Sequence, residues 1–478
     1  MMKIPRILLA AGSSGSGKTL ITCGLLKAMV NRGISTASFK CGPDYIDPMF
    51  HSRVIGTKSR NLDTFFSSEE ITRYLLGKNA ADCELAVMEG VMGYYDGLGG
   101  VTEKASAYDL ARVTDTPVIL IVNSRGMSVS LSAYIRGFLE YRRDSRIQGV
   151  IFNQMSPMLY PRMKELVEAE LPVKVLGYVP KVEDCLIESR HLGLVLPDEI
   201  PELQNRLQKL SEVLEKTLDI PGILALAREA PELSAKKPCV SDEDGENLLE
   251  WRLPANAGVR LGLARDEAFC FIYEDNLALL ESMGAEIVPF SLVHDKKLPE
   301  NLDGMLLYGG YPELNGQALE ANGEMKKEIA EAIRGGMPCM AECGGFMYLH
   351  EEMEDMDGVF RKMAGVIPGK VFRTPKLTRF GYIELRENAG EVRDETLFFE
   401  GDDPGVIPAH EFHYFDSENC GKDFHAAKPL GKRGWDCIHG SGNLMAGFPH
   451  LYYYGNPRVP KMFLKKCLRY RSHMQEVQ

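Results

Sequence analysis

The sequence predicts an α/β fold with two domains, on the basis of three observations. Short apolar runs alternate with helix-length segments in two separate series, and a polar stretch lies between the series. Apolar residues make up 45% of the chain and charged residues 26%, as is usual for a globular protein. The length of 478 residues suffices for two large α/β domains, each with a sizeable core.

The first series runs from Pro5 to about Pro180 and predicts a doubly wound domain. Near-continuous apolar strands that alternate with helices are typical of a parallel sheet covered by helices on both faces. A helix over Glu202–Leu218 is expected to close this domain. The predicted strands are Ile4–Ala10, Ile34–Phe39, Leu85–Met88, Pro117–Asn123, Gly149–Asn153 and Val173–Val179.

A second α/β series follows a segment rich in Lys, Asp and Glu. We therefore expect a first domain over residues 1–224, a linker over 225–257 and a second domain over 258–478. From Val359 onward Gly, Pro and aromatic residues are frequent, so we expect antiparallel or irregular structure that ends in a basic helix, Val459–Tyr470. The predicted strands of this series are Arg260–Ala264, Ala285–Phe290, Gly304–Tyr308 and Pro338–Ala341, and its predicted helices are Asn276–Met283 and Ala321–Arg334.

Composition argues against several classes of protein. The longest apolar run, Val118–Val122, is strand-sized, so no segment is predicted to cross a membrane. The apolar stretch Ile7–Ala11 is too short for a secretory signal, so we expect a cytoplasmic protein. Eleven cysteines without CxxC spacing predict reduced thiols rather than disulfides or structural zinc. The net charge of −12, without a basic run, disfavours nucleic acid as a partner.

Residues 12–19 form the phosphate-binding motif GxxxxGK[ST], which lies between a predicted strand and an amphipathic segment, Leu20–Val30. In this context the backbone N–H groups of the loop and of the helix N-terminus hold phosphates, Lys18 reaches the outer phosphates and Thr19 can ligate Mg²⁺. Asn153, at the end of a predicted strand, could read adenine or form a turn. The loop residues assigned to the nucleotide are Gly12, Ser13, Gly15, Ser16, Gly17, Lys18 and Thr19.

Carboxylates follow predicted strands at one edge of the first sheet. Glu89 comes directly after four apolar residues and is the expected metal-side carboxylate. Asp44 and Asp47 follow another strand, so they should lie at the carboxyl-end edge, where α/β proteins bind ligands. Both could also be turn-capping aspartates, and Asp96 could belong to a simple Asp-Gly turn.

Cys343 lies on a predicted strand-to-helix turn, in the sequence Ala341-Glu342-Cys343-Gly344-Gly345. A nucleophile at such an elbow projects from a sharp turn, the helix N-terminus lowers its pKa, and backbone N–H groups can stabilise an oxyanion. A second glycine turn, Gly309 and Gly310, follows the neighbouring strand and could supply the other oxyanion donor. A lone cysteine is usually a buried packing residue, but this context favours a nucleophile.

A thiolate nucleophile needs a base, and three late histidines could serve. His410 and His413 alternate with apolar residues as on a strand. Their spacing could also suggest a metal pair, although no third ligand has a recognisable spacing. His450 lies in the segment Gly447–Tyr452. Spacing alone does not choose among the three histidines.

Together these motifs resemble those of the cobyrinic acid a,c-diamide synthases, glutamine-dependent amidoligases of corrin biosynthesis. The resemblance spans almost the whole chain, and six ordered motifs across two domains are hard to obtain by chance. The six motifs are residues 12–19, Phe39–Pro48, Glu89–Gly97, Arg190–Leu194, Gly309–Glu313 and Ala341–Gly345.

The resemblance implies a dethiobiotin-synthetase-like ATP-binding domain followed by a class I glutamine amidotransferase domain. It also implies the reaction. ATP, held with Mg²⁺, phosphorylates a side-chain carboxylate of cobyrinate, and ammonia that Cys343 frees from glutamine displaces the phosphate, at the a and c carboxylates in succession. An acyl phosphate hydrolyses in water, which is a physical reason to shield the site. The partner is then a corrinoid small molecule, and a homodimer is one possible assembly.

The resemblance further implies roles for individual residues. His450 inherits the base role, because it stands at the family's late histidine. The residues expected to hold Mg²⁺ are Thr19, Asp47 and Glu89; those expected to bind or orient the substrate are Lys40, Asp44, Asp96 and Arg190; and those expected at the oxyanion and glutamine site are Gly309, Gly310 and Gly344.

Two positions depart from the family pattern. Tyr452 stands two residues after His450, where other class I amidotransferases have Glu and this family usually has a second His, so a Cys–His dyad is expected. Ala409 replaces a usual Gly before His-Glu-Phe-His.

Other substrates and one other class of protein are alternatives. Nickel-sirohydrochlorin, an intermediate of coenzyme F430 biosynthesis whose synthase has nearly the same motifs, and cobalt-free hydrogenobyrinate could undergo the same diamidation. A P-loop ATPase switch with an inactive glutaminase domain is a third alternative, because a fold alone does not fix function. The intact cysteine elbow argues against the switch, as does the absence of a signature lysine at Gly12 and Ser13.

Overall fold

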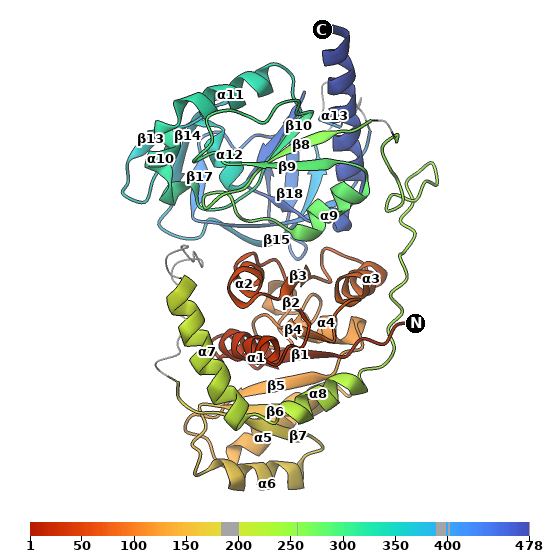
Figure 1. Cartoon of the computed structure of the whole chain (residues 1–478), viewed down its shortest axis with the longest axis vertical. Helices are drawn as coiled ribbons and strands as arrows, with labels where there is room; N and C mark the ends of the chain where they lie inside the picture. Colours follow the sequence, from red (N-terminus) through yellow and green to blue (C-terminus); the bar gives the residue numbers. More distant parts are fainter. Residues whose placement is uncertain (183–199, 256, 389–397, 400–401, 478) are drawn as a thin grey trace. The chain divides into compact units, whose positions relative to one another are not determined.

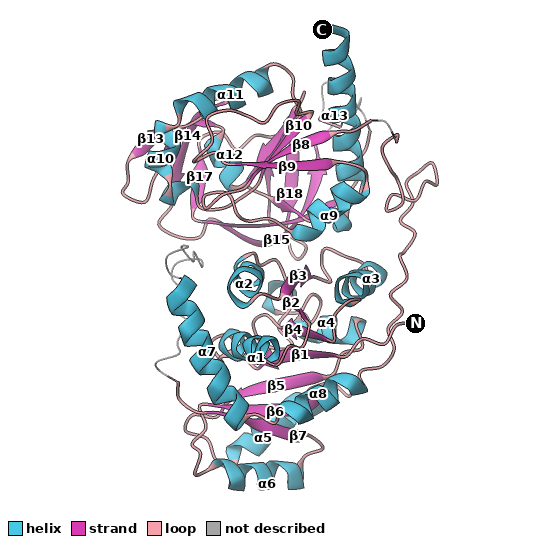
Figure 2. Cartoon of the chain, viewed as in Figure 1, coloured by secondary structure: helices cyan, strands magenta, loops and turns pink. Residues whose placement is uncertain are grey.

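A computed structural model describes the chain except residues 183–199, 256, 389–397, 400–401 and 478. It divides into two compact units, Met1–Pro238 (unit 1) and Cys239–Gln478 (unit 2), as Figure 1 shows in sequence colours. Each unit combines helices with its own central sheet (Figure 2), so the predicted α/β class is confirmed. Among the described residues no helix is long and apolar enough to cross a membrane.

Unit 1 contains a seven-stranded parallel sheet in the order β3-β2-β4-β1-β5-β6-β7. After β1 the chain places β2, β3 and β4 on one side of β1, and it then places β5, β6 and β7 on the other side. This is the predicted doubly wound arrangement. The six predicted strands are confirmed, while the edge strand β3 was not predicted. The strands are β1 (Arg6–Ala11), β2 (Thr36–Cys41), β3 (Lys58–Leu62), β4 (Leu85–Glu89), β5 (Val118–Asn123), β6 (Ile147–Asn153) and β7 (Lys174–Val179).

The helix after the phosphate-binding loop is held against the sheet of unit 1 by two later helices. The buried side chains of α1 (Lys18–Asn31), α7 (Ile200–Thr217) and α8 (Ile220–Glu229) form one apolar cluster with residues of β1. At Gly24 of α1 a Cβ would lie only 2.5 Å from Leu214 of α7, so glycine permits this close packing. The other helices are α2 (Ile46–Phe50), α3 (Glu69–Ala80), α4 (Ala107–Val113), α5 (Ser130–Tyr141) and α6 (Tyr160–Glu170).

Unit 2 is built around a six-stranded sheet in the order β20-β21-β11-β10-β8-β9, in which only β20 is antiparallel to its neighbour. The four strands predicted for this series are confirmed. The sheet strands are β8 (Arg260–Ala264), β9 (Glu286–Phe290), β10 (Gly304–Leu307), β11 (Cys339–Glu342), β20 (His439–Ser441) and β21 (Leu444–Gly447). The helices are α9 (Glu274–Ser282), α10 (Gly316–Ala321), α11 (Gly323–Arg334), α12 (Gly344–Tyr348) and α13 (Arg458–Val477).

The segment after Val359 is mostly antiparallel, as predicted, and ends in the predicted basic helix, α13. Strands β14 and β21 are exceptions, because they pair in parallel with β12 and β11. The remaining strands form two smaller sheets, β13-β12-β14-β17 and β19-β18-β15-β16-β22. These strands are β12 (His350–Glu354), β13 (Phe360–Lys362), β14 (Ile367–Arg373), β15 (Arg379–Glu387), β16 (Ile407–His413), β17 (Phe415–Ser417), β18 (Phe424–Ala427), β19 (Gly434–Cys437) and β22 (His450–Leu451).

Candidate functional site

The phosphate-binding motif of unit 1 folds as a loop that depends on glycine. Gly15 and Gly17 have φ angles of 74° and 90°, in the left-handed region that glycine adopts without strain. A Cβ at Gly17 would lie 2.3 Å from Nδ2 of Asn153. That amide donates a hydrogen bond of 2.8 Å to the carbonyl oxygen of Ser16. Asn153 therefore supports the loop in this structure, and its contact with adenine stays a prediction.

The ammonium group of Lys18, the first residue of α1, lies against the loop. Its Nζ donates hydrogen bonds to the carbonyl oxygens of Ser13 (3.0 Å) and Met92 (2.5 Å). Burial, together with the nearby charge of Lys40, lowers the pKa of Lys18. An anionic phosphate would be a stronger partner for this buried ammonium group than neutral carbonyl oxygens are.

Four side chains at the carboxyl ends of β2 and β4 and the start of α1 form one hydrogen-bonded chain. Thr19 Oγ1 donates to Oε1 of Glu89 (2.6 Å), and Nζ of Lys40 donates to the same oxygen (2.8 Å). Lys40 also donates to Oδ2 of Asp47. The structure thus brings together the three residues predicted to hold Mg²⁺, with Lys40 as a counter-ion between the two carboxylates.

Burial and charge act against each other in this cluster. Burial raises the pKa of Glu89, and Lys40 only partly offsets this effect. Burial also acts on Asp47, but there the charge and hydrogen bond of Lys40 prevail and hold the pKa below its ordinary value. Burial disfavours a charged Lys40, yet Glu89 and Asp47 raise its pKa well above the ordinary value. Lys40 is therefore a cation at neutral pH.

The second oxygen of Glu89 fits a metal site. Oε2 is buried without a hydrogen-bond partner among the described residues, and Nε2 of His51 lies 3.8 Å from it. Mg²⁺ in nucleotide sites is held by one or two carboxylates, a P-loop hydroxyl and substrate phosphates. In the described part of the chain no cluster of three or more His, Cys, Asp or Glu side chains could hold a metal alone. Thr19 and Glu89 therefore fit a metal that arrives with phosphates.

Asp44 and Asp96 cap turns in this structure. Oδ1 of Asp44 accepts hydrogen bonds from two N–H groups at the start of α2 (2.8 and 3.1 Å). Oδ2 of Asp96 accepts one from the N–H of Gly93 (3.0 Å). Burial, with the neighbouring Asp47, raises the pKa of Asp44 to about 6. Their roles toward a substrate stay predictions, and Arg190 lies outside the described residues.

In unit 2, Cys343 lies on a sharp turn between β11 and α12. Its φ of 45° and ψ of −103° are strained for a residue with a Cβ. Its N–H donates to the carbonyl oxygen of Gly447 in β21 (2.8 Å). A Cβ at Gly345 would lie 1.9 Å from the carbonyl oxygen of Leu307, so the turn requires glycine there. This is the predicted strand-to-helix turn, and the role of the thiol as a nucleophile stays a prediction.

The turn formed by Gly309 and Gly310 lies beside this elbow. A Cβ at Gly344 would lie 3.0 Å from the backbone nitrogen of Gly310. A Cβ at Gly310 would in turn lie 2.1 Å from the carbonyl oxygen of Ala268. The structure thus brings together the three glycines predicted for the oxyanion and glutamine site. The backbone nitrogen of Gly310 therefore lies next to Gly344, and the role of these N–H groups as oxyanion donors stays a prediction.

His450 is placed against both features of the elbow. A Cβ at Gly309 would lie 2.6 Å from Cε1 of the His450 ring. Nδ1 of His450 lies 3.6 Å from Oε2 of Glu342, the residue before the nucleophile. His410 lies opposite His450 in the pairing of β16 with β22, and the two rings stack with centroids 4.9 Å apart. This placement favours His450 as the base.

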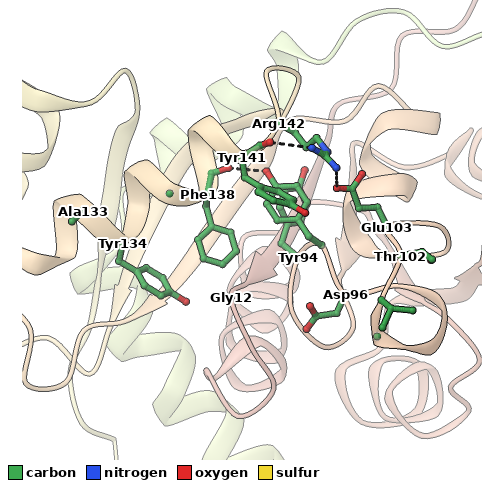
Figure 3. A pocket seen from close by; sticks show the side chains of 14 residues that line it. Gly12, Tyr94, Asp96, Thr102, Glu103, Ala133, Tyr134, Phe138, Tyr141 and Arg142 are labelled. Atoms are coloured by element: carbon green, nitrogen blue, oxygen red, sulfur yellow. Dashed lines mark hydrogen bonds and ion pairs between the residues drawn. The ribbon is translucent and has the colours of Figure 1, made fainter.

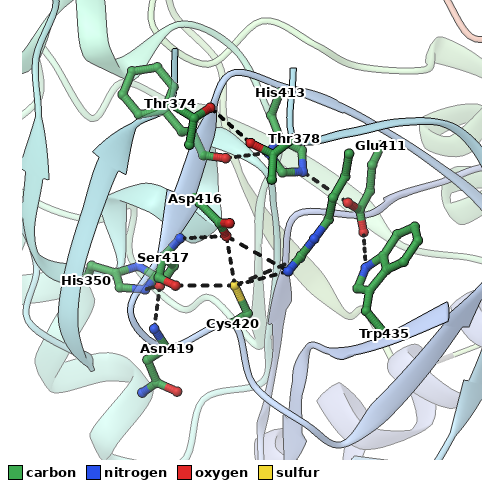
Figure 4. A network of polar contacts seen from close by, with 12 residues as sticks. His350, Thr374, Thr378, Glu411, His413, Asp416, Ser417, Asn419, Cys420 and Trp435 are labelled. Atoms are coloured by element: carbon green, nitrogen blue, oxygen red, sulfur yellow. Dashed lines mark hydrogen bonds and ion pairs between the residues drawn. The ribbon is translucent and has the colours of Figure 1, made fainter. Parts of the chain in front are cut away.

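His413 belongs to a separate polar network, which Figure 4 shows. Its Nδ1 donates to the carbonyl oxygen of Phe415 (2.6 Å), and its Nε2 lies 3.0 Å from Oε2 of Glu411. Trp435 donates to the other oxygen of Glu411 (3.2 Å). Both ring nitrogens of His413 therefore have protein partners, and the metal pair that its spacing from His410 could suggest does not form in this structure.

Burial keeps Cys343 and His450 neutral in the resting site. Burial raises the pKa of the Cys343 thiol, and the hydrogen bond from Gly344 offsets this only in part. The N–H at the start of α12 thus lowers the pKa as expected, but the burial of the thiol outweighs it. Burial, with His413, lowers the pKa of His450 to about 3. The imidazole is therefore neutral in the resting site, and its role as the base stays a prediction.

Known proteins resemble both units of this chain. A family model for the CobQ/CobB/MinD/ParA nucleotide binding domain matches residues 7–194, and one for the CobB/CobQ-like glutamine amidotransferase domain matches residues 260–457. The cobyrinate a,c-diamide synthase of Caldanaerobacter subterraneus subsp. tengcongensis is 36% identical over 466 residues, which are 97% of this chain and 98% of that protein. The chain belongs to the cobyrinate a,c-diamide synthase family.

Two further members of the family cover the chain to a similar extent. The synthase of Thermoplasma volcanium is 35% identical over 471 residues, 98% of each chain. That of Dehalococcoides mccartyi is 36% identical over 471 residues, 97% of this chain and 98% of its own. The resemblance inferred from six motifs is therefore confirmed.

Two features of the candidate sites in this chain were not predicted from the sequence. One is Glu342, an acidic residue at the end of the otherwise uncharged strand β11, and that contrast was the signal available in the sequence. The other is a group of aromatic side chains near Gly12, among them Tyr134 and Phe138 at the i,i+4 spacing of one helix face.

Proposed function

We propose that this chain uses ATP and glutamine to amidate the a and c carboxylates of cobyrinate. The observation that carries the proposal is that one chain holds both a P-loop with a Thr19–Glu89 contact and a strained cysteine elbow beside His450. A glutamine-dependent ligase needs these two activities. The 36% identity to a curated synthase over 97% of the chain supports the substrate.

In unit 1, the loop and Lys18 bind the phosphates of ATP and orient the outer one toward the acceptor. Thr19, Glu89 and Asp47 would hold Mg²⁺, which when bound neutralises phosphate charge. A carboxylate oxygen of the acceptor attacks the γ-phosphorus, the bond to ADP breaks, and an acyl phosphate forms. Lys40, Asp44 and Asp96 orient that carboxylate. We extend the same proposal to Arg190 at the substrate and Asn153 near adenine.

In unit 2, the Cys343 sulfur attacks the side-chain amide carbon of glutamine while its proton passes to His450. The N–H groups of Gly310 and Gly344 stabilise the oxyanion. His450 then protonates the leaving nitrogen, ammonia departs, and water hydrolyses the thioester to glutamate. Ammonia attacks the acyl phosphate and releases phosphate. A cytoplasmic location and a homodimer complete the proposal.

A competition assay tests this function. The purified protein is given ATP, Mg²⁺ and ¹⁵N-amide glutamine with cobyrinate, hydrogenobyrinate and nickel-sirohydrochlorin together, and products are read by mass spectrometry. We expect two labelled amides on cobyrinate. Label on hydrogenobyrinate or nickel-sirohydrochlorin instead would mean that the proposed reaction is right but that its substrate is that macrocycle. ATP hydrolysis without label on any macrocycle would contradict the proposal and favour a nucleotide switch.

The Cys343→Ala variant is the matched control for the nitrogen source. It should lose glutamine hydrolysis and label transfer from glutamine, yet still amidate cobyrinate when ammonium salt is supplied. Loss of both nitrogen sources would mean that the substitution disturbs more than the glutaminase step.

A further inference from the structure

Unit 1 contains a pocket of about 790 Å³ that borders the P-loop (Figure 3). Residues 94–103 form one wall, and α5 with Arg142 forms the other. Its volume lies in the range of small-molecule sites. Gly12 of the P-loop and Asp96 also line it, so the pocket is continuous with the site of phosphoryl transfer.

Aromatic rings in fixed orientations form much of this pocket. The ring of Tyr95 is nearly parallel to that of Phe138 (18° between planes, centroids 5.9 Å apart) and contacts those of Tyr94 and Tyr141. Its hydroxyl donates to the carbonyl oxygen of Phe138 (2.7 Å). Tyr134 packs on Phe138 at 5.1 Å. Such preorganised ring faces suit a flat, largely apolar ligand.

The pocket lies at the outer-phosphate end of the loop. Lys18, which reaches the outer phosphates in P-loops, donates to the carbonyl oxygen of Met92. The chain then enters the pocket wall at Tyr94, whose N–H donates to Ala11 at the end of β1 (2.8 Å). A Cβ at Gly12 would lie 1.8 Å from the hydroxyl oxygen of Tyr134. The pocket therefore lies where an acceptor must approach the phosphoryl group that is transferred.

We propose that this pocket binds the macrocycle of the acceptor, with the ring against the aromatic wall and one side-chain carboxylate directed toward Lys18. This inference rests on the proposed function. At the pocket, Arg142 pairs with Glu103 (2.6 Å) and its guanidinium lies 4.5 Å from the centre of the Tyr141 ring, so it can bind another peripheral carboxylate.

Gly137 offers a way to fill the pocket without displacing protein atoms. It lies in the middle of α5, lines the pocket, and has no heavy atom within 4 Å of the position of an added Cβ. Leucine also favours a helix more than glycine does. Gly137→Leu should therefore fold normally and exclude the macrocycle. Ser130→Leu adds the same group at an exposed position of the same helix outside the pocket lining and is the matched control.

Equilibrium dialysis with cobyrinate, whose visible absorbance reports binding, tests the inference. Gly137→Leu should weaken cobyrinate binding at least about tenfold and raise its KM in the amidation assay. The KM for ATP and the rate of glutamine hydrolysis should stay within about twofold of wild type, as should all values for Ser130→Leu. Tyr134→Ala removes one partly exposed ring of the wall and should weaken cobyrinate binding in the same direction.

The outcomes separate this inference from the function on which it rests. If wild type does not bind or amidate cobyrinate, the proposed function fails and this inference falls with it. If wild type binds cobyrinate and the Gly137→Leu and Tyr134→Ala variants bind it as tightly as wild type, the function stands and the pocket assignment is overturned. If the variants weaken ATP binding instead, the pocket holds the nucleotide and the assignment is likewise wrong.

Discussion

The carboxyl group of Glu342 lies 3.6 Å from Nδ1 of His450, although the two residues are far apart in the sequence. Burial raises the pKa of Glu342 well above its ordinary value and lowers that of His450 to about 3, so a charge on either buried group favours the opposite charge on the other. Once His450 takes the proton of Cys343, Glu342 can stabilise the imidazolium. Tyr452, two residues after His450, instead donates to Asp275 (3.3 Å). We infer that Glu342 positions the base.

Glu342→Gln should slow glutamine hydrolysis about 10²-fold, because an amide, unlike a carboxyl group, cannot become the anion that stabilises the imidazolium. The pH dependence of glutamine hydrolysis should also change, whereas ammonia-dependent amidation should not. Glutamate release measured between pH 5 and 9 checks both points. Glu324→Gln, at an exposed position of α11, is the control. A rate within about twofold of wild type would exclude the positioning role.

Glu89→Gln should raise the Mg²⁺ concentration needed for half-maximal amidation by about tenfold or more, because it removes a carboxylate from the metal side of the phosphates. Glutamine hydrolysis should be unaffected. A Mg²⁺ titration of ATP-dependent amidation is the measurement, with Glu165→Gln on the exposed face of α6 as control. An unchanged Mg²⁺ requirement would contradict the assignment of Glu89.

His350→Gln should make unit 2 less sensitive to acid. Nδ1 of the buried His350 donates to Phe346 and its Nε2 accepts from Ser417, and burial lowers its pKa to about 4. An unfolded histidine has a pKa of about 6.5, so between about pH 6.5 and 4 only the unfolded state binds the proton. Stability present above about pH 6.5 is then lost as the pH falls, by up to about 1.4 kcal/mol per pH unit.

Urea unfolding followed by tryptophan fluorescence measures this effect. Trp251 and Trp435 are the chain's two tryptophans and both belong to unit 2, so the signal reports that unit. Other titrating groups are common to both proteins and cancel in the comparison. The stability difference between wild type and His350→Gln should shrink as the pH falls from 7 to about 4.5. A difference that does not vary with pH would refute the prediction.

Gly345→Ala should destabilise unit 2 by about 3 kcal/mol and abolish glutamine hydrolysis. The added Cβ would lie 1.9 Å from the backbone carbonyl oxygen of Leu307, which cannot move without displacing β10. Gly323→Ala is the control, because it adds the same atom where no heavy atom lies within 4 Å. The measurement is the urea midpoint of unfolding of each variant. Equal midpoints for Gly345→Ala and Gly323→Ala would be incompatible with this packing.

The sheets were predictable from sequence because most of their strands are buried on both faces. Strands such as β1 and β4 read as continuous apolar runs for that reason. Strand β3 reads Lys-Ser-Arg-Asn-Leu and pairs only with β2 at the sheet edge, so its polar composition concealed it. The single helix expected over Ala321–Arg334 begins only at Gly323, because the side chain of Asn322 donates to carbonyl oxygens such as that of Leu292 (2.9 Å).

The sites were predictable only where their chemistry is local. The P-loop and the cysteine elbow are continuous motifs, and their turn geometry follows from their own glycines. The position of Lys40 between Asp47 and Glu89 depends on the register of β2 with β4, which no local pattern reveals. The choice of His450 likewise depends on the pairing of β16 with β22.

The positive φ angle of Cys343 lowers the folding stability of the protein at the position where the proposed activity needs a cysteine. Glycine would adopt this conformation without strain, whereas a residue with a Cβ gives up about 1–3 kcal/mol there. Mutation toward glycine at this position would therefore produce a more durable protein without a nucleophile. A chain that took its nitrogen from a source other than glutamine would therefore gain stability from glycine at this position.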